Sequence, residues 1–329
     1  MSAAATSQNV VALCGGIGGA KLALGLYRIL GSQLTVIVNT GDDFEHLGLN
    51  ISPDLDTVLY TLGGLADPKR GWGRAEETWE FMTSLRGLAG ETWFQLGDRD
   101  LAMHVERTAW LRSGRTLSTF TARVARAFGI RATILPMSDG PLRTAVDTDE
   151  GNLPFQHYFV RRKSEPVVRA IRFDGAEDVL PAPGLLDLLS DVNLQAIVLC
   201  PSNPYLSIDP ILAVPGIAAA LMAARAPAIA VSPIIGGRAV KGPTAKIMTE
   251  LGLEVTNVSI ASHYRGLIDA LVIDESDASD RARLDIAALV TRTFMRDLND
   301  RERLAGEICS FARQNALQSR TPMRAGSAR

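Results

Sequence analysis

The stretch VVALCGGIGGAKLALGLYRIL, residues 10–30, decides the fold of this protein. Its first five residues are apolar, which is typical of a strand covered on both faces. The glycines Gly15, Gly16, Gly18 and Gly19 follow, and residues 20–30 then carry an apolar pattern of helical period. A strand, a glycine turn and a helix in this order begin many phosphate-binding sites.

Three further apolar runs predict the rest of a sheet. They span residues 34–38, 196–200 and 226–231, and helical patterns follow the last two at 209–224 and 244–251. Alternating strands and helices predict an α/β fold with a doubly wound, mostly parallel sheet.

Two segments are predicted to be additions to this core. Residues 67–128 have helical periodicity with aromatic and charged side chains, which indicates a helical insertion, and residues 143–160 alternate about a DEGN turn, which predicts a β-hairpin added to the sheet. Residues 279–313 have a helical pattern. We therefore divide the chain into a nucleotide- or diphosphate-binding core (1–66 and 129–278), the insertion (67–128) and a C-terminal helix and tail (279–329).

The composition narrows the functional class. The 329 residues are 47% hydrophobic and 21% charged, with a formal net charge of -2 and no dense basic run, so no nucleic-acid partner is predicted. The three cysteines are far apart and have no zinc spacing, which indicates reduced thiols in a cytoplasmic protein. No apolar run approaches about 18 residues and no secretion signal is present, so neither membrane spanning nor export is predicted.

The glycine turn predicts an anion site. Glycines let an anion approach main-chain N–H groups at a helix start, where the helix dipole also favours negative charge. Lys21 then falls in the first turn, within reach of a phosphate. The spacing fits neither the Walker motif nor a strict G-x-G-x-x-G, so an NAD site is weakly supported. A turn that only packs a helix closely on a strand remains the alternative.

The loop NTGDDFEHLGLNISPDLDTVLYTL, residues 39–62, brings carboxylates to the same edge of the sheet. Asn39, Asp42 and Asp43 follow a strand, and Asp54 and Asp56 open the next helix. Clustered acids beside a phosphate repel it unless a cation lies between them, and oxygen ligands suit Mg²⁺. Asp42 as a turn residue and Asp54 as a dipole-stabilised helix acid are the alternatives.

Other polar residues follow strands or begin helices. Asp98 is predicted to cap a helix, and Arg99, unfavourable in a first turn, faces either an anion or solvent. The loops at 199–210 and 231–248 add substrate-binding candidates: Ser202, Asn203, Ser232, Gly236, Gly237 and Lys241. No serine elbow and no cysteine in a polar turn is present, so covalent catalysis has no evident residue. Phosphoryl transfer, which needs positioning and charge stabilisation, suits this set.

Six motifs together resemble the phospholactate transferase (CofD) family of deazaflavin coenzyme F-420 biosynthesis, over about residues 10–275. They are GGIGGAKLALGL, VNTGDDFEHLGLNISPDLDTVLYTLGG, RGWG, LGDRDLAMH, PSNPYLSIDPIL and SPIIGGRAVKGPTAKIM. The resemblance implies a Rossmann-like fold, a homodimer and a Mg²⁺-dependent reaction. In it the ribityl hydroxyl of 7,8-didemethyl-8-hydroxy-5-deazariboflavin (Fo) attacks a guanosine-diphospho-linked acid and GMP leaves.

The resemblance also implies site residues. Asp56 and Gln95 match positions that contact the deazaflavin, although relatives often have a basic residue in place of Gln95, and Asp42 and Asp43 match the acidic loop near the metal. Combined with the reading of the motifs, this assigns Lys21 and the glycine turn to the diphosphate, Asp42, Asp43 and Asp56 to the metal, and Arg99 with Lys241 to the leaving group. Asp56 would orient or deprotonate the hydroxyl.

Two other functions compete with this one. A nucleotide-sugar-binding regulator of the gluconeogenesis-factor type would bind without turnover, and an NAD dehydrogenase would use Asp42 for a ribose but leave Lys21 and the other acids without a role. The acid itself is open, because phospholactate, phosphoenolpyruvate and 3-phosphoglycerate differ by a small group that pocket shape reads at about 1–3 kcal/mol.

Overall fold

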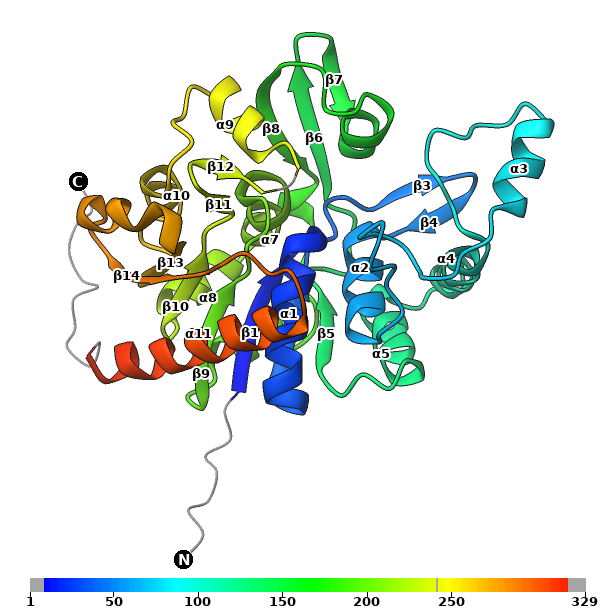
Figure 1. The fold of residues 1–329 in the computed structure, drawn as a ribbon. Helices are drawn as coiled ribbons and strands as arrows, with labels where there is room; N and C mark the ends of the chain where they lie inside the picture. Colours follow the sequence, from blue (N-terminus) through cyan, green and yellow to red (C-terminus); the bar gives the residue numbers. More distant parts are fainter. Residues whose placement is uncertain (1–8, 241, 319–329) are drawn as a thin grey trace, which may run out of the picture.

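Strand β1 (Asn9–Cys14) lies inside a seven-stranded parallel sheet of order β14-β13-β10-β9-β1-β2-β5 (Figure 1). The computed structural model describes residues 9–240 and 242–318. The other strands of the sheet are β2 (Leu34–Val38), β5 (Thr133–Pro136), β9 (Leu194–Leu199), β10 (Ala228–Val231), β13 (Ala270–Asp274) and β14 (Ala287–Thr291). The predicted α/β, Rossmann-like class is confirmed.

Helices cover both faces of this sheet because its strands are apolar on both. Along β1, Val10 and Ala12 belong to one core and Val11 and Leu13 to the other. The first core is closed by α1 (Gly16–Leu30), α2 (Pro53–Leu62), α5 (Leu117–Ala127) and α11 (Leu298–Gln318). The second is closed by α6 (Leu185–Ser190), α7 (Asp209–Ala213), α8 (Ile217–Ala223), α9 (Thr244–Glu250) and α10 (Asn257–His263).

The order of the strands fixes where a ligand can bind. From β1 the chain builds β2 and β5 on one side, and it then returns to place β9, β10, β13 and β14 on the other side. The direction of winding therefore reverses between β1 and β9. In open α/β sheets the crevice outside the carboxyl ends at such a reversal is the usual binding site.

The segment predicted as a helical insertion, residues 67–128, contains α3 (Glu80–Gly87), α4 (Asp98–Arg112) and α5. The acidic loop before it is partly ordered as a hairpin of β3 (Phe44–His46) and β4 (Leu49–Ile51), which the sequence reading treated as loop only. Leu47 and Gly48 both have positive φ there and make the tight turn that joins the two strands. The division of the chain into three domains stays a prediction.

Three expectations need correction. The hairpin of β6 (Arg143–Thr148) and β7 (Gly151–Pro154) does not extend the central sheet, because β6 pairs on its other edge with β8 (Val168–Asp174) in a separate sheet. The helix expected over 209–224 is broken between α7 and α8, where Pro215 and the positive φ of Gly216 end it. Residues 279–313 are not continuously helical, because they contain β14, the edge strand of the sheet.

The remaining elements are short. They are η1 (Gly31–Gln33), η2 (His157–Arg161), η3 (Ala176–Asp178), η4 (Pro204–Ile208), η5 (Glu275–Arg283), β11 (Ile234–Ile235) and β12 (Arg238–Ala239). Within the described residues no single helix is long and apolar enough to cross a membrane. The segments Pro204–Ala213 and Ile217–Ala223 meet that length and composition only as a pair, which is bent by 89°.

Close packing of α1 on α11 leads to a stability prediction. A Cβ on Gly25 would lie 2.2 Å from the main-chain oxygen of Arg301, which cannot swing away as a side chain can. Gly25→Ala should therefore lower the free energy of unfolding by about 1–3 kcal/mol in urea titrations. Gly306→Ala on α11 is the matched control, because a Cβ there meets nothing within 4 Å, and it should raise that free energy by about 0.4–1 kcal/mol. Equal losses in the two variants would contradict this packing argument.

Candidate active site

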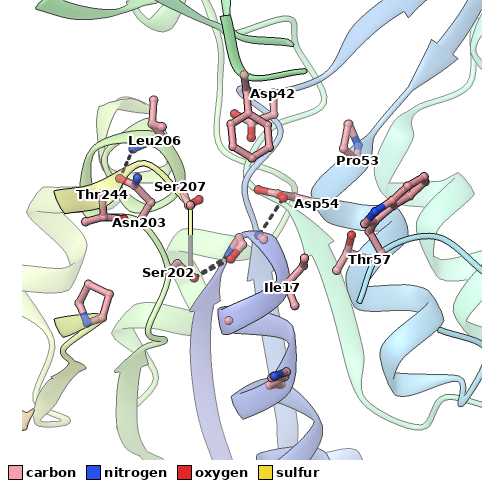
Figure 2. Close-up of a pocket in the computed structure, with 18 of the residues that line it drawn as sticks. Ile17, Asp42, Pro53, Asp54, Thr57, Ser202, Asn203, Leu206, Ser207 and Thr244 are labelled. Carbon is pink, nitrogen blue, oxygen red and sulfur yellow. Dashed lines mark hydrogen bonds between the residues drawn. The ribbon is translucent and has the colours of Figure 1, made fainter. Parts of the chain in front are cut away.

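A cavity of about 650 Å³ opens where the winding of the sheet reverses. Figure 2 shows the start of α1 in its middle, with Pro53, Asp54 and Thr57 of α2 on one side and Ser202, Asn203, Leu206 and Thr244 on the other. Of the predicted site residues, the cavity is lined by Gly15, Gly16, Gly18, Lys21, Asp42, Asp54, Asp56, Gln95, Ser202, Asn203 and Ser232. One concave site therefore gathers residues from both halves of the sheet.

The glycine turn forms the floor of the cavity. Gly18 packs so closely on the loop after β9 that a Cβ there would lie 2.6 Å from the oxygen of Pro201. The first four N–H groups of a helix have no partner within the helix, and of these the Gly16 N–H donates to Asp54 Oδ1 at 2.7 Å. The next two, of Ile17 and Gly18, belong to residues that line the cavity. The anion site predicted at the start of α1 stays a prediction, and its candidate donors are the N–H groups of Ile17 and Gly18 rather than that of Gly16.

Asp54 and Asn39 hold this turn in place. Asn39 is fully buried, and its Nδ2 donates to Asp54 Oδ2 at 3.0 Å. Burial raises the pKa of Asp54 to about 6, although both hydrogen bonds act to lower it. Asn39 does not line the cavity, so its side chain contacts other residues of the protein and not the space where a substrate could bind.

The neighbouring carboxylates Asp42 and Asp43 point to different places. Asp42 lines the cavity, and its Oδ1 is buried without a hydrogen-bond partner among the described residues. Burial raises the pKa of Asp42 well above its ordinary value, and the charge of Asp54 raises it further. Asp43 instead lines a second cavity of about 110 Å³ and accepts a hydrogen bond from Ser52 Oγ at 2.7 Å. Burial raises the pKa of Asp43 to about 7.

Asp56 belongs to a charged chain between α2 and α4. Its Oδ1 accepts a hydrogen bond from Arg107, whose side chain is 1% exposed. His104 Nδ1 lies 3.7 Å from Asp56 Oδ2, and His104 Nε2 lies 3.3 Å from Asp100 Oδ2. Tyr60 donates its hydroxyl to Asp100. Burial raises the pKa of Asp56 even though the Arg107 charge acts to lower it.

Two sets of residues fit a metal to different degrees. Asp56, Asp100 and His104 offer ligand atoms that all lie within 4.8 Å of one another. However, Arg107 and Tyr60 already satisfy one oxygen on each of those carboxylates, and the third ligand is nitrogen. Mg²⁺ prefers oxygen and takes one or two carboxylates. The orphaned Oδ1 of Asp42 beside Asp54 fits Mg²⁺ better, because a cation there would also relieve the repulsion between two buried acids.

Several predicted residues lie away from the cavity. Asp98 accepts hydrogen bonds from Glu80 N and Phe81 N and so holds the start of α3. Arg99 Nη1 donates to Glu76 Oε2 at 3.1 Å in an exposed ion pair. The N–H groups of Gly236 and Gly237 donate to Asp277. Gly19 is buried against the side chains of Ser202 and Cys14, and Lys241 lies outside the described residues.

Three groups of residues at or beside the cavity were not predicted from the sequence. An aromatic wall comes from Tyr60, Trp72, Phe94, Phe155 and Phe159. The segment before α11 contributes Thr293, Phe294 and Met295, and Lys21 Nζ donates to the Met295 oxygen at 3.4 Å. The charged chain on α4 was also missed, although Asp100, His104 and Arg107 have the spacing that puts side chains on one helix face. That spacing was the one signal in the sequence that could have predicted the charged chain.

Comparisons with known proteins agree with this geometry. Residues 10–312 match the family model described as 2-phospho-L-lactate transferase CofD. A phosphoenolpyruvate transferase of Kitasatospora aureofaciens is 40% identical over 318 residues, 93% of this chain and 98% of that protein. A 2-phospho-L-lactate transferase of Methanosarcina mazei is 39% identical over 272 residues, 82% and 88% of the two chains.

A crystal structure of a UPF0052 family member from Bacillus halodurans has the same fold, with a TM-score of 0.61 and 16% identity over 93% of this chain and 99% of that one. At that identity the likeness describes the fold alone. The family model and the relatives each cover most of the chain that carries the cavity. The protein therefore belongs to the CofD family of 2-phospho-L-lactate transferases.

Proposed function

We propose that this protein transfers a phospho-acid from its guanosine-diphospho-linked form to the ribityl hydroxyl of Fo in coenzyme F-420 biosynthesis. The observation that carries the proposal is the cavity itself, where the start of α1 faces Asp56 and an aromatic wall across about 650 Å³. Ligand sites of this kind have volumes of about 300–1,000 Å³. Anion donors and flat rings in one cavity suit a diphosphate and a deazaflavin together.

The two substrates are assigned to opposite sides. The acceptor is placed toward α2 and the insertion, where Tyr60, Trp72 and Phe94 supply ring faces and Gln95 supplies an amide. The diphosphate is placed over Ile17 and Gly18, with Lys21, Ser202 and Asn203 on its other flank. Asn203 Nδ2 is a buried donor with no partner among the described residues, so it is available to a substrate oxygen.

The chain's own residues would carry out the step by positioning and by moving one proton. The acceptor oxygen bonds to the phosphorus that carries the acid, the bond from that phosphorus to the GMP oxygen breaks, and GMP leaves with the electron pair. Asp56 takes the hydroxyl proton at its carboxylate. Lys21 and the start of α1 stabilise the charge that develops on the departing phosphate. In this proposal Lys21 and the start of α1 take the role at the leaving group that was predicted for Arg99, because Arg99 pairs with Glu76 in solvent.

A divalent cation completes the proposal. Asp42 would hold Mg²⁺ through its orphaned oxygen, with Asp54 and Asp56 close by and Asp43 excluded by its position in the second cavity. When bound, Mg²⁺ supplies a Lewis acid that neutralises diphosphate oxygens.

The test is to incubate the protein with Fo, Mg²⁺ and each activated acid separately, and to identify products by mass spectrometry. Relatives named for phosphoenolpyruvate and for phospholactate have nearly the same identity to this chain, so 3-phosphoglycerate is included beside both. We expect a phosphodiester of Fo and equimolar GMP with at least one acid, and no product with EDTA. If no acid gave product and the protein did not retain fluorescent Fo, a binding regulator would replace this proposal.

A further inference from the structure

The guanidinium of Arg107 contacts three partners at once inside the protein. Nη2 donates to Asp56 Oδ1, Nη1 donates to the main-chain oxygen of Asn50 at 3.1 Å, and Nη1 lies 3.4 Å from His104 Nδ1. Its Cζ stands 5.5 Å from the ring centroid of Phe120. Arg107 is 1% exposed and does not line the cavity, so it acts on substrates only through the residues it touches.

His104 completes the support of Asp56. Its Nε2 lies 3.3 Å from Asp100 Oδ2, and its Nδ1 lies 3.4 Å from Arg107 Nη1 and 3.7 Å from Asp56 Oδ2. Because a guanidinium can only donate, Nδ1 is the acceptor beside Arg107, so we assign the Nε2–H tautomer. Tyr60, hydrogen-bonded to the other oxygen of Asp100, fixes that carboxylate in turn.

These contacts leave one oxygen of Asp56 without a hydrogen bond. Oδ1 is held by Arg107, whereas Oδ2 is buried with no hydrogen-bond partner among the described residues and lies 3.7 Å from His104 Nδ1. Asp56 lines the cavity. A carboxylate held by one oxygen and free at the other presents a single acceptor in a fixed direction, which is what abstraction of a proton from a positioned hydroxyl requires.

We propose that Arg107 is a positioning residue for the transfer reaction, which holds Oδ1 of Asp56 and so leaves Oδ2 as the oxygen that takes the proton of the acceptor hydroxyl. This inference rests on the proposed function. A lysine cannot replace the arginine fully, because a single ammonium does not span the carboxylate, the Asn50 oxygen and the imidazole as the planar fork does.

A double-mutant cycle with Asp56→Asn tests the proposal. Arg107→Met should lower kcat by about 10- to 100-fold with little change in the KM for Fo, as the loss of a supporting partner does elsewhere. In the Asp56→Asn background the same substitution should lower kcat by less than about twofold, because the carboxylate that acts as base is already absent. The kcat of Arg107→Lys should lie between that of Arg107→Met and that of the unchanged protein.

Thr108→Val is the matched control. Thr108 is buried on α4, and its hydroxyl accepts from Asn50 N at 2.8 Å, so this variant disturbs the same interface without touching Asp56. It should leave kcat unchanged. An equal fall of kcat for Arg107→Met in both backgrounds, or a comparable fall for Thr108→Val, would assign Arg107 to stability of the interface instead.

A crystal structure of Arg107→Met gives a readout that needs no turnover. The Asp56 carboxylate should rotate away from its present direction, and an unmoved carboxylate would overturn the proposal even if kcat had fallen. Absence of product from the unaltered protein with all three acids would instead reject the proposed function.

Discussion

Asp56→Asn is expected to lower kcat for formation of the Fo phosphodiester by about 10²–10⁴-fold, the usual contribution of a general base. Asparagine keeps an oxygen that can accept from Arg107, so the buried guanidinium is not left without a partner. It cannot take a proton from the acceptor hydroxyl. The substitution should therefore lower kcat and leave the free energy of unfolding nearly unchanged.

The measurement is a steady-state assay beside a fluorescence titration of Fo. The Fo dissociation constant should change far less than kcat, because the aromatic wall of Tyr60, Trp72 and Phe94 is unaltered. Circular dichroism and urea unfolding verify that the variant is folded. Near-normal turnover with Fo bound would remove Asp56 from the role of base.

Gly18→Ala is expected to lower kcat/KM for the activated acid by about 100-fold, the scale of loss that a shift of about 1 Å in a site can cause. The new Cβ would lie 2.6 Å from the Pro201 oxygen, so either the start of α1 or the loop after β9 must move. Both carry groups that we assign to the diphosphate. Because the new Cβ is fixed on α1 and meets main-chain atoms of Pro201, no rotation of a side chain can relieve the contact.

The readout that isolates this effect is competition by GDP, whose inhibition constant should rise while Fo binding stays nearly constant. Gly306→Ala makes the same chemical change on a helix with open space around it, and it should leave both constants as they are. A parallel loss of Fo affinity in Gly18→Ala would mean that the substitution disturbs the whole cavity and not the diphosphate side.

The part of the fold that the sequence predicted is the part encoded locally. Runs such as residues 34–38 are apolar on both faces and bounded by turn residues, and β2 has these bounds. Strand β14 was missed because four of its five residues are only partly buried and it follows the charged turns of η5, a pattern that reads as helix and solvent. Edge strands owe their state to a neighbour, here β13, which local patterns do not include.

The site residues also divide into those that the local sequence predicts and those whose position depends on tertiary packing. The glycine turn and the acids follow β1 and β2 directly, so the rule that carboxyl ends of parallel strands share an edge brings them together. Arg107 was missed because an arginine on a helix is normally solvated, and its burial depends on how the insertion packs on α2. The directions of Asp42 and Asp43 depend on the β3–β4 hairpin, whose register was not predicted.

The contact between α1 and α11 has a consequence for biosynthesis. Helix α1 leaves the ribosome more than 250 residues before its partner α11 and the cavity segment 293–295. Domains fold as units while synthesis proceeds from the N-terminus. A nascent chain must therefore keep the apolar side of α1 without its α11 cover until residues 298–318 have been made, and a product stopped before residue 293 would lack both that cover and one wall of the cavity.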